Sequence, residues 1–108
     1  MLTDSNIKII RNKLYYNTDK YKYKIENDIY STGRNRYTVL RVTITYKNSL
    51  TTRYYSNLKR NIPNKHKNII KELFEYYESN VLMLMILQGI KFYKYINWLE
   101  DDEVLYEQ

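Results

Sequence analysis

Lysine, arginine and tyrosine side chains recur at every second position in several segments of this chain. In a β-strand, that spacing places them on one face of a sheet. Lysine and arginine can neutralise phosphate groups, and tyrosine rings can stack on nucleobases. The residues expected on this face or in the loop beside it are Lys20, Lys22, Lys24, Arg34, Arg36, Tyr37, Arg41, Arg53 and Tyr55. The pattern predicts a nucleic-acid-binding surface; the alternative is that these residues only keep the wet side of a sheet soluble.

Charge is distributed unevenly along the 108 residues. The net charge is +6, yet residues 29–71 contain ten lysines and arginines and no aspartate or glutamate. Such a stretch is typical of a surface that binds phosphates. Residues 100–108, in contrast, form an acidic C-terminal tail.

A second basic cluster surrounds a predicted helix start, and it consists of Lys59, Arg60, Lys65, His66 and Lys67. The N-terminus of a helix attracts anions, so basic residues there are unfavourable for the helix itself. Their position would be explained if a bound anion completed the site. The alternative is a solvated, charged loop in which His66 is an ordinary surface residue.

The periodicity of apolar residues predicts the elements that position these side chains. Residues 3–16 read as a helix, because Ile7, Ile10 and Leu14 follow a helical spacing. Three segments alternate with period two and are predicted to be strands, namely 20–30, 37–47 and 51–56. A three-residue hairpin loop at 48–50 would pair Ile44 with Tyr54 and keep Arg53 out of the core.

The second half of the chain reads as helical. Residues 65–80 have an apolar stripe, and Asn64 can cap that helix after Pro63. Residues 81–87 are apolar throughout, which is compatible with a helix or a buried strand, and a short helix or strand follows at 90–99. The predicted fold is therefore a single α+β domain, 1–108. We expect a three-stranded antiparallel sheet with helices packed on one face, in the order α-β-β-β-α-α.

The order α-β-β-β-α with a basic helix start resembles the double-stranded RNA-binding domain over about residues 3–79. That family grips phosphates with lysines at the start of its last helix. Lys65 and Lys67 are the matching residues here. The resemblance implies contact with the phosphates of a nucleic-acid duplex.

Several classes of protein are not expected. The chain has no cysteine and one histidine, so neither a disulfide framework nor a transition-metal site is expected. It has no glycine-rich phosphate loop or metalloprotease motif, and no cofactor is predicted. No segment reaches the roughly 20 apolar residues of a membrane span, and a signal peptide is not recognisable. A cytoplasmic, membrane-independent protein is predicted.

Two other functions remain open. Tyr93, Tyr95 and Trp98 lie in an aromatic C-terminal third that could anchor a protein–protein interface, and the apolar run 81–87 could be covered in a homodimer. Small ribonuclease toxins are similar in size and charge. In that reading Arg41, Arg53, Tyr55 and His66 would serve as charge stabilisers and general acid or base.

Composition gives a hint of origin. The 14 tyrosines and the excess of isoleucine, lysine and asparagine suggest AT-rich codons, and the small size resembles accessory proteins of phages and mobile elements. The predicted function is a non-catalytic binding protein that engages nucleic acid or a host nucleoprotein complex. In the host cytoplasm it would serve host takeover or anti-defence, for example as an anti-CRISPR inhibitor.

Overall fold

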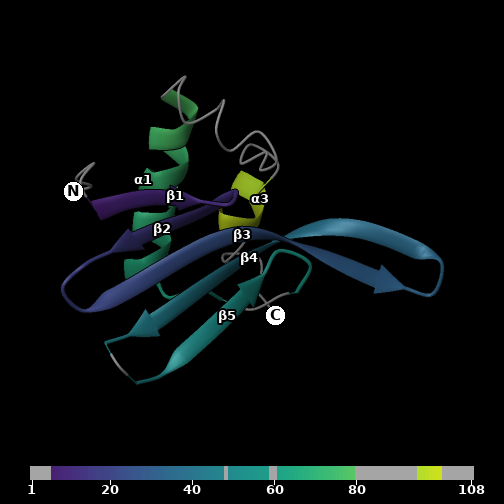
Figure 1. Ribbon diagram of the computed structural model, residues 1–108, viewed down its shortest axis with the longest axis horizontal. Helices are drawn as coiled ribbons and strands as arrows, with labels where there is room; N and C mark the ends of the chain where they lie inside the picture. Colours follow the sequence, from purple (N-terminus) through teal and green to yellow (C-terminus); the bar gives the residue numbers. More distant parts are fainter. Residues whose placement is uncertain (1–5, 48, 59–60, 80–94, 101–108) are drawn as a thin grey trace.

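The computed structural model describes residues 6–47, 49–58, 61–79 and 95–100 (Figure 1). Within these residues, one antiparallel sheet contains its strands in sequence order, each paired with the next. The strands are β1 (Ile7–Ile10), β2 (Lys13–Asn17), β3 (Tyr21–Thr32), β4 (Asn35–Tyr46) and β5 (Thr51–Tyr55). Two helices follow, α1 (Asn64–Ser79) and α3 (Ile96–Glu100).

The predicted N-terminal helix is instead the hairpin of β1 and β2. Arg11 and Asn12 have positive φ angles of 51° and 63°, the backbone that a two-residue type I′ turn requires. Ile10 pairs with Lys13 across this turn. The helical spacing of the apolar residues was misleading, because Ile7 and Ile9 are also two residues apart, half-buried and β-branched, which suits a strand.

Strands form where the three period-two segments predicted them, although one pairing differs. Ile44 pairs with Thr52 and not with Tyr54, so the expected pairing is wrong by two residues. Because side chains alternate with period two, a shift of two keeps each one on its face. Arg53 is therefore exposed and Tyr54 buried, as predicted.

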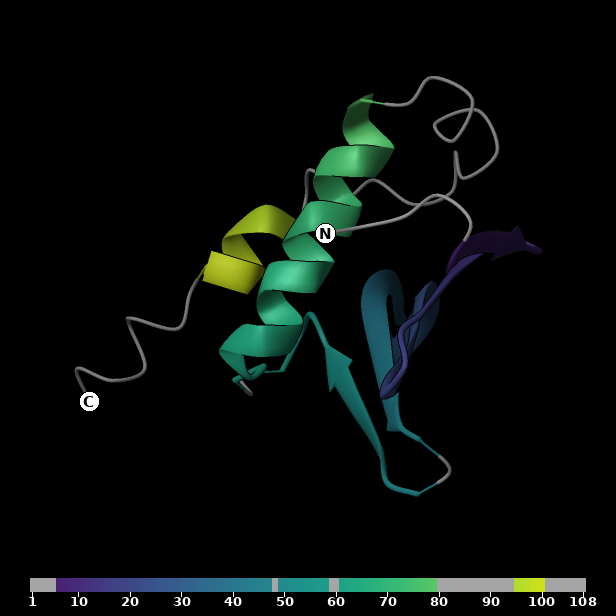
Figure 2. The ribbon, with the colours of Figure 1, turned by 90° about the vertical axis from the view of Figure 1, so that its left-hand side faces the viewer.

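The core lies between the sheet and the helices. Figure 2 shows α1 and α3 on the same side of the sheet. From the sheet, Leu14, Ile25, Val42 and Tyr54 form one row across four strands and are all buried. The helices contribute the buried side chains Ile70, Leu73, Phe74, Tyr77 and Leu99. No described helix covers the opposite face, which we call the open face.

The predicted three-stranded architecture with the order α-β-β-β-α-α is therefore wrong. Among the described residues, the sheet has five strands and is accompanied by one main helix and one short helix. The topological resemblance to the double-stranded RNA-binding domain ends with it, since no described helix precedes the sheet. The apolar run 81–87, on which the expected homodimer depended, lies outside the described residues.

The hairpin of β3 and β4 extends past the helix-covered part of the sheet (Figure 1). Every residue from 29 to 38 is exposed, whereas Val39 and Leu40 are buried. A two-residue turn closes the tip, where Thr32 pairs with Asn35 and Gly33 has a positive φ of 58°. We call residues 29–38 the arm.

The β1–β2 turn gives a direct test of this fold. Changing Arg11→Asn together with Asn12→Gly supplies the Asn-Gly pair that a type I′ turn favours. Relief of backbone strain should raise the free energy of unfolding by about 1 kcal/mol. The expected rise in Tm, followed by circular dichroism, is roughly 4–8 °C.

Asn35→Gly is the matched control, because Asn35 is an exposed strand residue without a positive φ. Glycine there should lower stability by about 0.5–1 kcal/mol. A helix over residues 3–16 would give the opposite sign for the turn variant, since glycine in a helix costs about 1 kcal/mol.

Candidate nucleic-acid interface

Strand pairing brings the predicted basic residues together on the open face. Tyr15, Lys24, Thr43 and Arg53 form one row across β2 to β5. The next row contains Glu26, Arg41 and Tyr55. The alternation predicted from sequence therefore places these cations on the face opposite α1.

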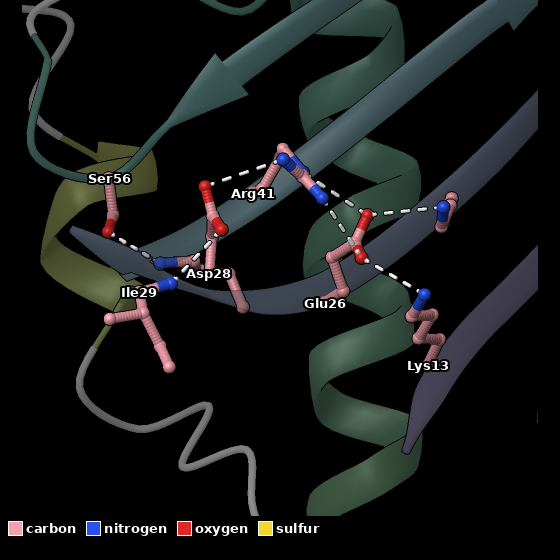
Figure 3. Close-up of polar contacts among 8 residues, drawn as sticks. Lys13, Glu26, Asp28, Ile29, Arg41 and Ser56 are labelled. Carbon is pink, nitrogen blue, oxygen red and sulfur yellow. Dashed lines mark hydrogen bonds and ion pairs between the residues drawn. The ribbon is translucent and has the colours of Figure 1, made fainter. Parts of the chain in front are cut away.

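A buried carboxylate lies at the centre of this face. Glu26 is only 3% exposed, although alternation places it on the side without a helix. Its oxygens lie 3.6 Å from Lys13 Nζ, 3.4 Å from Lys24 Nζ and 3.2 Å from Arg41 Nη2 (Figure 3). Arg41 Nε also donates a hydrogen bond to it at 3.2 Å. One carboxylate thus links three neighbouring strands.

Arg41 connects Glu26 to a second acid. Its Nη1 lies 3.4 Å from Asp28 Oδ2, and Tyr55 pairs with Arg41 across β4 and β5. Burial opposes ionisation of Glu26, but Arg41 and Lys24 outweigh it, so the pKa of Glu26 lies below its ordinary value. The hydrogen bond that Arg41 donates to Glu26 raises the pKa of Arg41 in turn.

Acidic partners therefore compensate part of the charge predicted for phosphate binding. Lys24 and Arg41 both form ion pairs with Glu26, which lies on the same face. Lys20, Lys22 and Arg53 make no ion pair with any described residue. These three cations remain available at the wet surface of the sheet.

The arm carries the other predicted contacts. Arg34 and Arg36 lie at its tip and make no ion pair within the described ranges. Tyr30 and Tyr37 pair across the hairpin with ring centroids 5.0 Å apart, and they are 39% and 44% exposed. Both rings lie on the same side of the ribbon as the open face. Sequence reasoning chose Tyr37 and missed Tyr30, its cross-strand partner.

The residues of the second basic cluster do not share one environment. Lys65 is exposed and donates a hydrogen bond to Tyr21 Oη at 2.9 Å, which raises the pKa of Lys65. Lys67 is half-buried and already interacts with another part of the protein. Lys59 and Arg60 lie outside the described residues.

His66 is the largest surprise of this cluster, because it is buried and only 7% exposed. Its Nδ1 shares a 2.8 Å hydrogen bond with Tyr23 Oη. Burial and then the charge of Lys65 lower the pKa of His66, while burial raises the pKa of Tyr23 to about 12. The expectation of a surface histidine is wrong, and its spacing from Ile70, Leu73 and Tyr77 on α1 was the missed signal.

The residues of the ribonuclease hypothesis do not meet. His66 packs on the helix side of the sheet, while Arg41, Arg53 and Tyr55 lie on the open face. The residues of the protein-interface hypothesis are also differently placed. Tyr95 and Trp98 are partly buried against the core, and Tyr93 lies outside the described residues.

Comparison of the chain with known protein families, curated proteins and solved structures found no match. Among the described residues, no helix is long and apolar enough to cross a membrane. The same residues contain no group of three or more histidine, cysteine, aspartate or glutamate side chains placed to hold a metal ion.

The ion pairs of Glu26 predict that removing its charge will destabilise the fold. Glu26→Gln should lower the free energy of unfolding near neutral pH by about 1.5–3 kcal/mol, because charged hydrogen bonds to Arg41 and Lys24 are lost. A folded-state pKa below 4.5 stabilises the fold above pH 4.5 and loses that effect as pH falls. Urea unfolding should therefore show the two proteins converging in acid.

Asp19→Asn is the matched control, since Asp19 is exposed and forms no ion pair with a described residue. It should leave stability within about 0.5 kcal/mol of the wild type. Equal stability of Glu26→Gln and wild type near neutral pH would contradict the assigned role of Glu26.

His66 predicts a second pH dependence in a separate window. Its folded-state pKa lies below 6.5, so the unfolded chain binds the proton first. The free energy of unfolding should fall as pH is lowered below 6.5 and continue falling until the folded-state pKa is reached. Because the chain has one histidine, His66→Gln should remove this slope. A wild type without a slope between about pH 5 and about pH 7 would refute it.

Proposed function

We propose that this protein is a non-catalytic nucleic-acid-binding protein whose arm makes the principal contact. The observation that carries the proposal is an exposed two-stranded ribbon with two arginines, two exposed tyrosines and no acidic residue. Figure 1 shows the arm extending away from the two helices, and each of its residues is exposed.

The arm matches the dimensions and chemistry of a nucleic-acid groove. The major groove of B-DNA admits a two-stranded β-ribbon. Arg34 and Arg36 would neutralise phosphates or read guanine edges, and Tyr30 and Tyr37 would contact sugars or bases. The ladder from Ile29 to Thr38 fixes the ribbon before binding, which lowers the ordering cost.

The open face supports the same partner with a secondary contact. Lys20, Lys22 and Arg53 lie at the sheet surface and can add phosphate contacts beyond the arm. Glu26 compensates Lys24 and Arg41, so the middle of the face is less positive than the sequence implied. We therefore place the centre of the nucleic-acid-binding surface on the arm and not on the middle of the sheet.

The composition supports a phage or mobile-element origin, which would place the protein in the host cytoplasm. There it would engage nucleic acid alone or within a nucleoprotein complex, such as a CRISPR complex that it inhibits. The packing of Tyr95 and Trp98 against the core disfavours the rival protein-interface hypothesis, which depends on those rings being free.

The test is a titration of the purified protein with a short DNA duplex and a short RNA duplex. We expect binding that weakens steeply between about 50 mM and about 200 mM salt. Arg34→Ala with Arg36→Ala should weaken binding about tenfold or more at low salt, and should reduce the salt slope by about 1.8 if both contact phosphates.

Lys8→Gln with Lys47→Gln is the control, since it removes the same two charges from exposed positions far from the arm. If this control weakens binding as much as the arm variant, the arm is not the principal contact. Absence of any duplex binding at low salt would overturn the proposed function.

A further inference from the structure

A pocket opens at the other end of the β3–β4 hairpin from the arm. It lies on the helix side of the sheet, where the β4–β5 loop meets the first turn of α1, and its volume is about 260 Å³. Its walls include Tyr21, Tyr46, Leu50, Tyr54, Lys65 and His66. Pockets that bury drug-sized ligands measure about 300–1,000 Å³, so this space can hold one planar ring system while the rest of a ligand stays at the rim.

Four of the nine residues that line the pocket carry aromatic rings. Tyr21 and Tyr46 pair across the strands with ring centroids 5.2 Å apart, and the His66 ring meets Tyr21 edge-on at 4.5 Å. Tyr46 is 46% exposed and Leu50 is 78% exposed. These apolar surfaces face solvent at the pocket mouth, so a planar ligand can reach the rings.

Lys65 supplies a fixed positive charge at the rim. Its Nζ donates to Tyr21 Oη at 2.9 Å and lies 5.2 Å from the centre of that ring. An ammonium group has three donors, so two remain for a ligand. Among the described residues, none that lines the pocket is acidic, and the first turn of α1 contains no acidic residue.

This chemistry selects among ligand classes. Aromatic walls alone would also suit a cation, but the Lys65 ammonium would repel one. A planar aromatic group joined to an anion satisfies both the rings and the ammonium. A nucleotide provides this combination, with the base stacked on Tyr46 and the phosphate at Lys65.

We propose that this pocket binds one nucleotide. The nucleotide is either free or an unstacked unit of a single strand, and the second source rests on the proposed nucleic-acid-binding function. Base stacking on Tyr46 and phosphate contact with Lys65 are the two interactions that hold it. The pocket and the arm lie at opposite ends of β4, so each can be altered without touching the other.

The first experiment is calorimetric titration of the full chain with adenosine monophosphate, adenosine and inorganic phosphate. Adenosine monophosphate should bind more tightly than either fragment. Lys65→Gln and Tyr46→Ala should each weaken it about tenfold. Lys8→Gln removes the same charge at an exposed site in β1 and should change nothing. Two-dimensional NMR of the wild type locates the perturbed residues without any substitution.

A single-stranded oligonucleotide gives the second arm of the test. If adenosine monophosphate binds and the strand does not compete, the source is a free nucleotide. If the strand binds and Lys65→Gln weakens it, the source is a unit of that strand. The inference is overturned if neither probe binds at Tyr46 and Lys65, whether by titration or by NMR. The arm variant Arg34→Ala with Arg36→Ala should keep adenosine monophosphate binding, so failure of the arm and failure of the pocket are distinguishable.

Discussion

The structure depends on how far one helix can cover the sheet, because its two longest strands reach past that helix. The 12 residues of β3 and of β4 span about 40 Å, and α1 crosses the strands toward one end of them (Figure 1). The covered part becomes the core, where Leu14, Ile25, Val42 and Tyr54 meet the helix. The uncovered part of the sheet is exposed to water, and its polar and basic composition suits that exposure.

The sequence predicted local alternation better than global architecture. The period-two pattern is clear in β3, β4 and β5, because Tyr23, Ile25 and Val42 face the core while their neighbours along the strand lie on the open face. The N-terminal hairpin was missed because Ile7, Ile10 and Leu14 fit a helical period, and the turn at Arg11 and Asn12 lacks the glycine that normally marks it. Periodicity alone could not separate these two solutions.

The candidate sites show a similar division. Alternation assigned Arg53 and Arg41 to one face, but it could not show that Glu26 would be buried among Lys13, Lys24 and Arg41, since these residues come from three strands. The pocket could not be predicted from the sequence either, because two of its lining residues, Tyr21 and Lys65, are 44 residues apart in the chain. Contacts of this kind are set by register and helix docking, which a single sequence specifies only through the whole fold.

The strictly sequential order of the strands has a consequence for the way the chain reaches this structure. Each strand pairs with its immediate successor, so every step of sheet assembly closes only a short loop. Hairpins can form one after another, each using its predecessor as a template, in the manner of a zipper. The long-range step is the arrival of α1, which brings His66 to Tyr23 across 43 residues. Collapse of the aromatic core around that pair, and not strand pairing, would then set the folding rate.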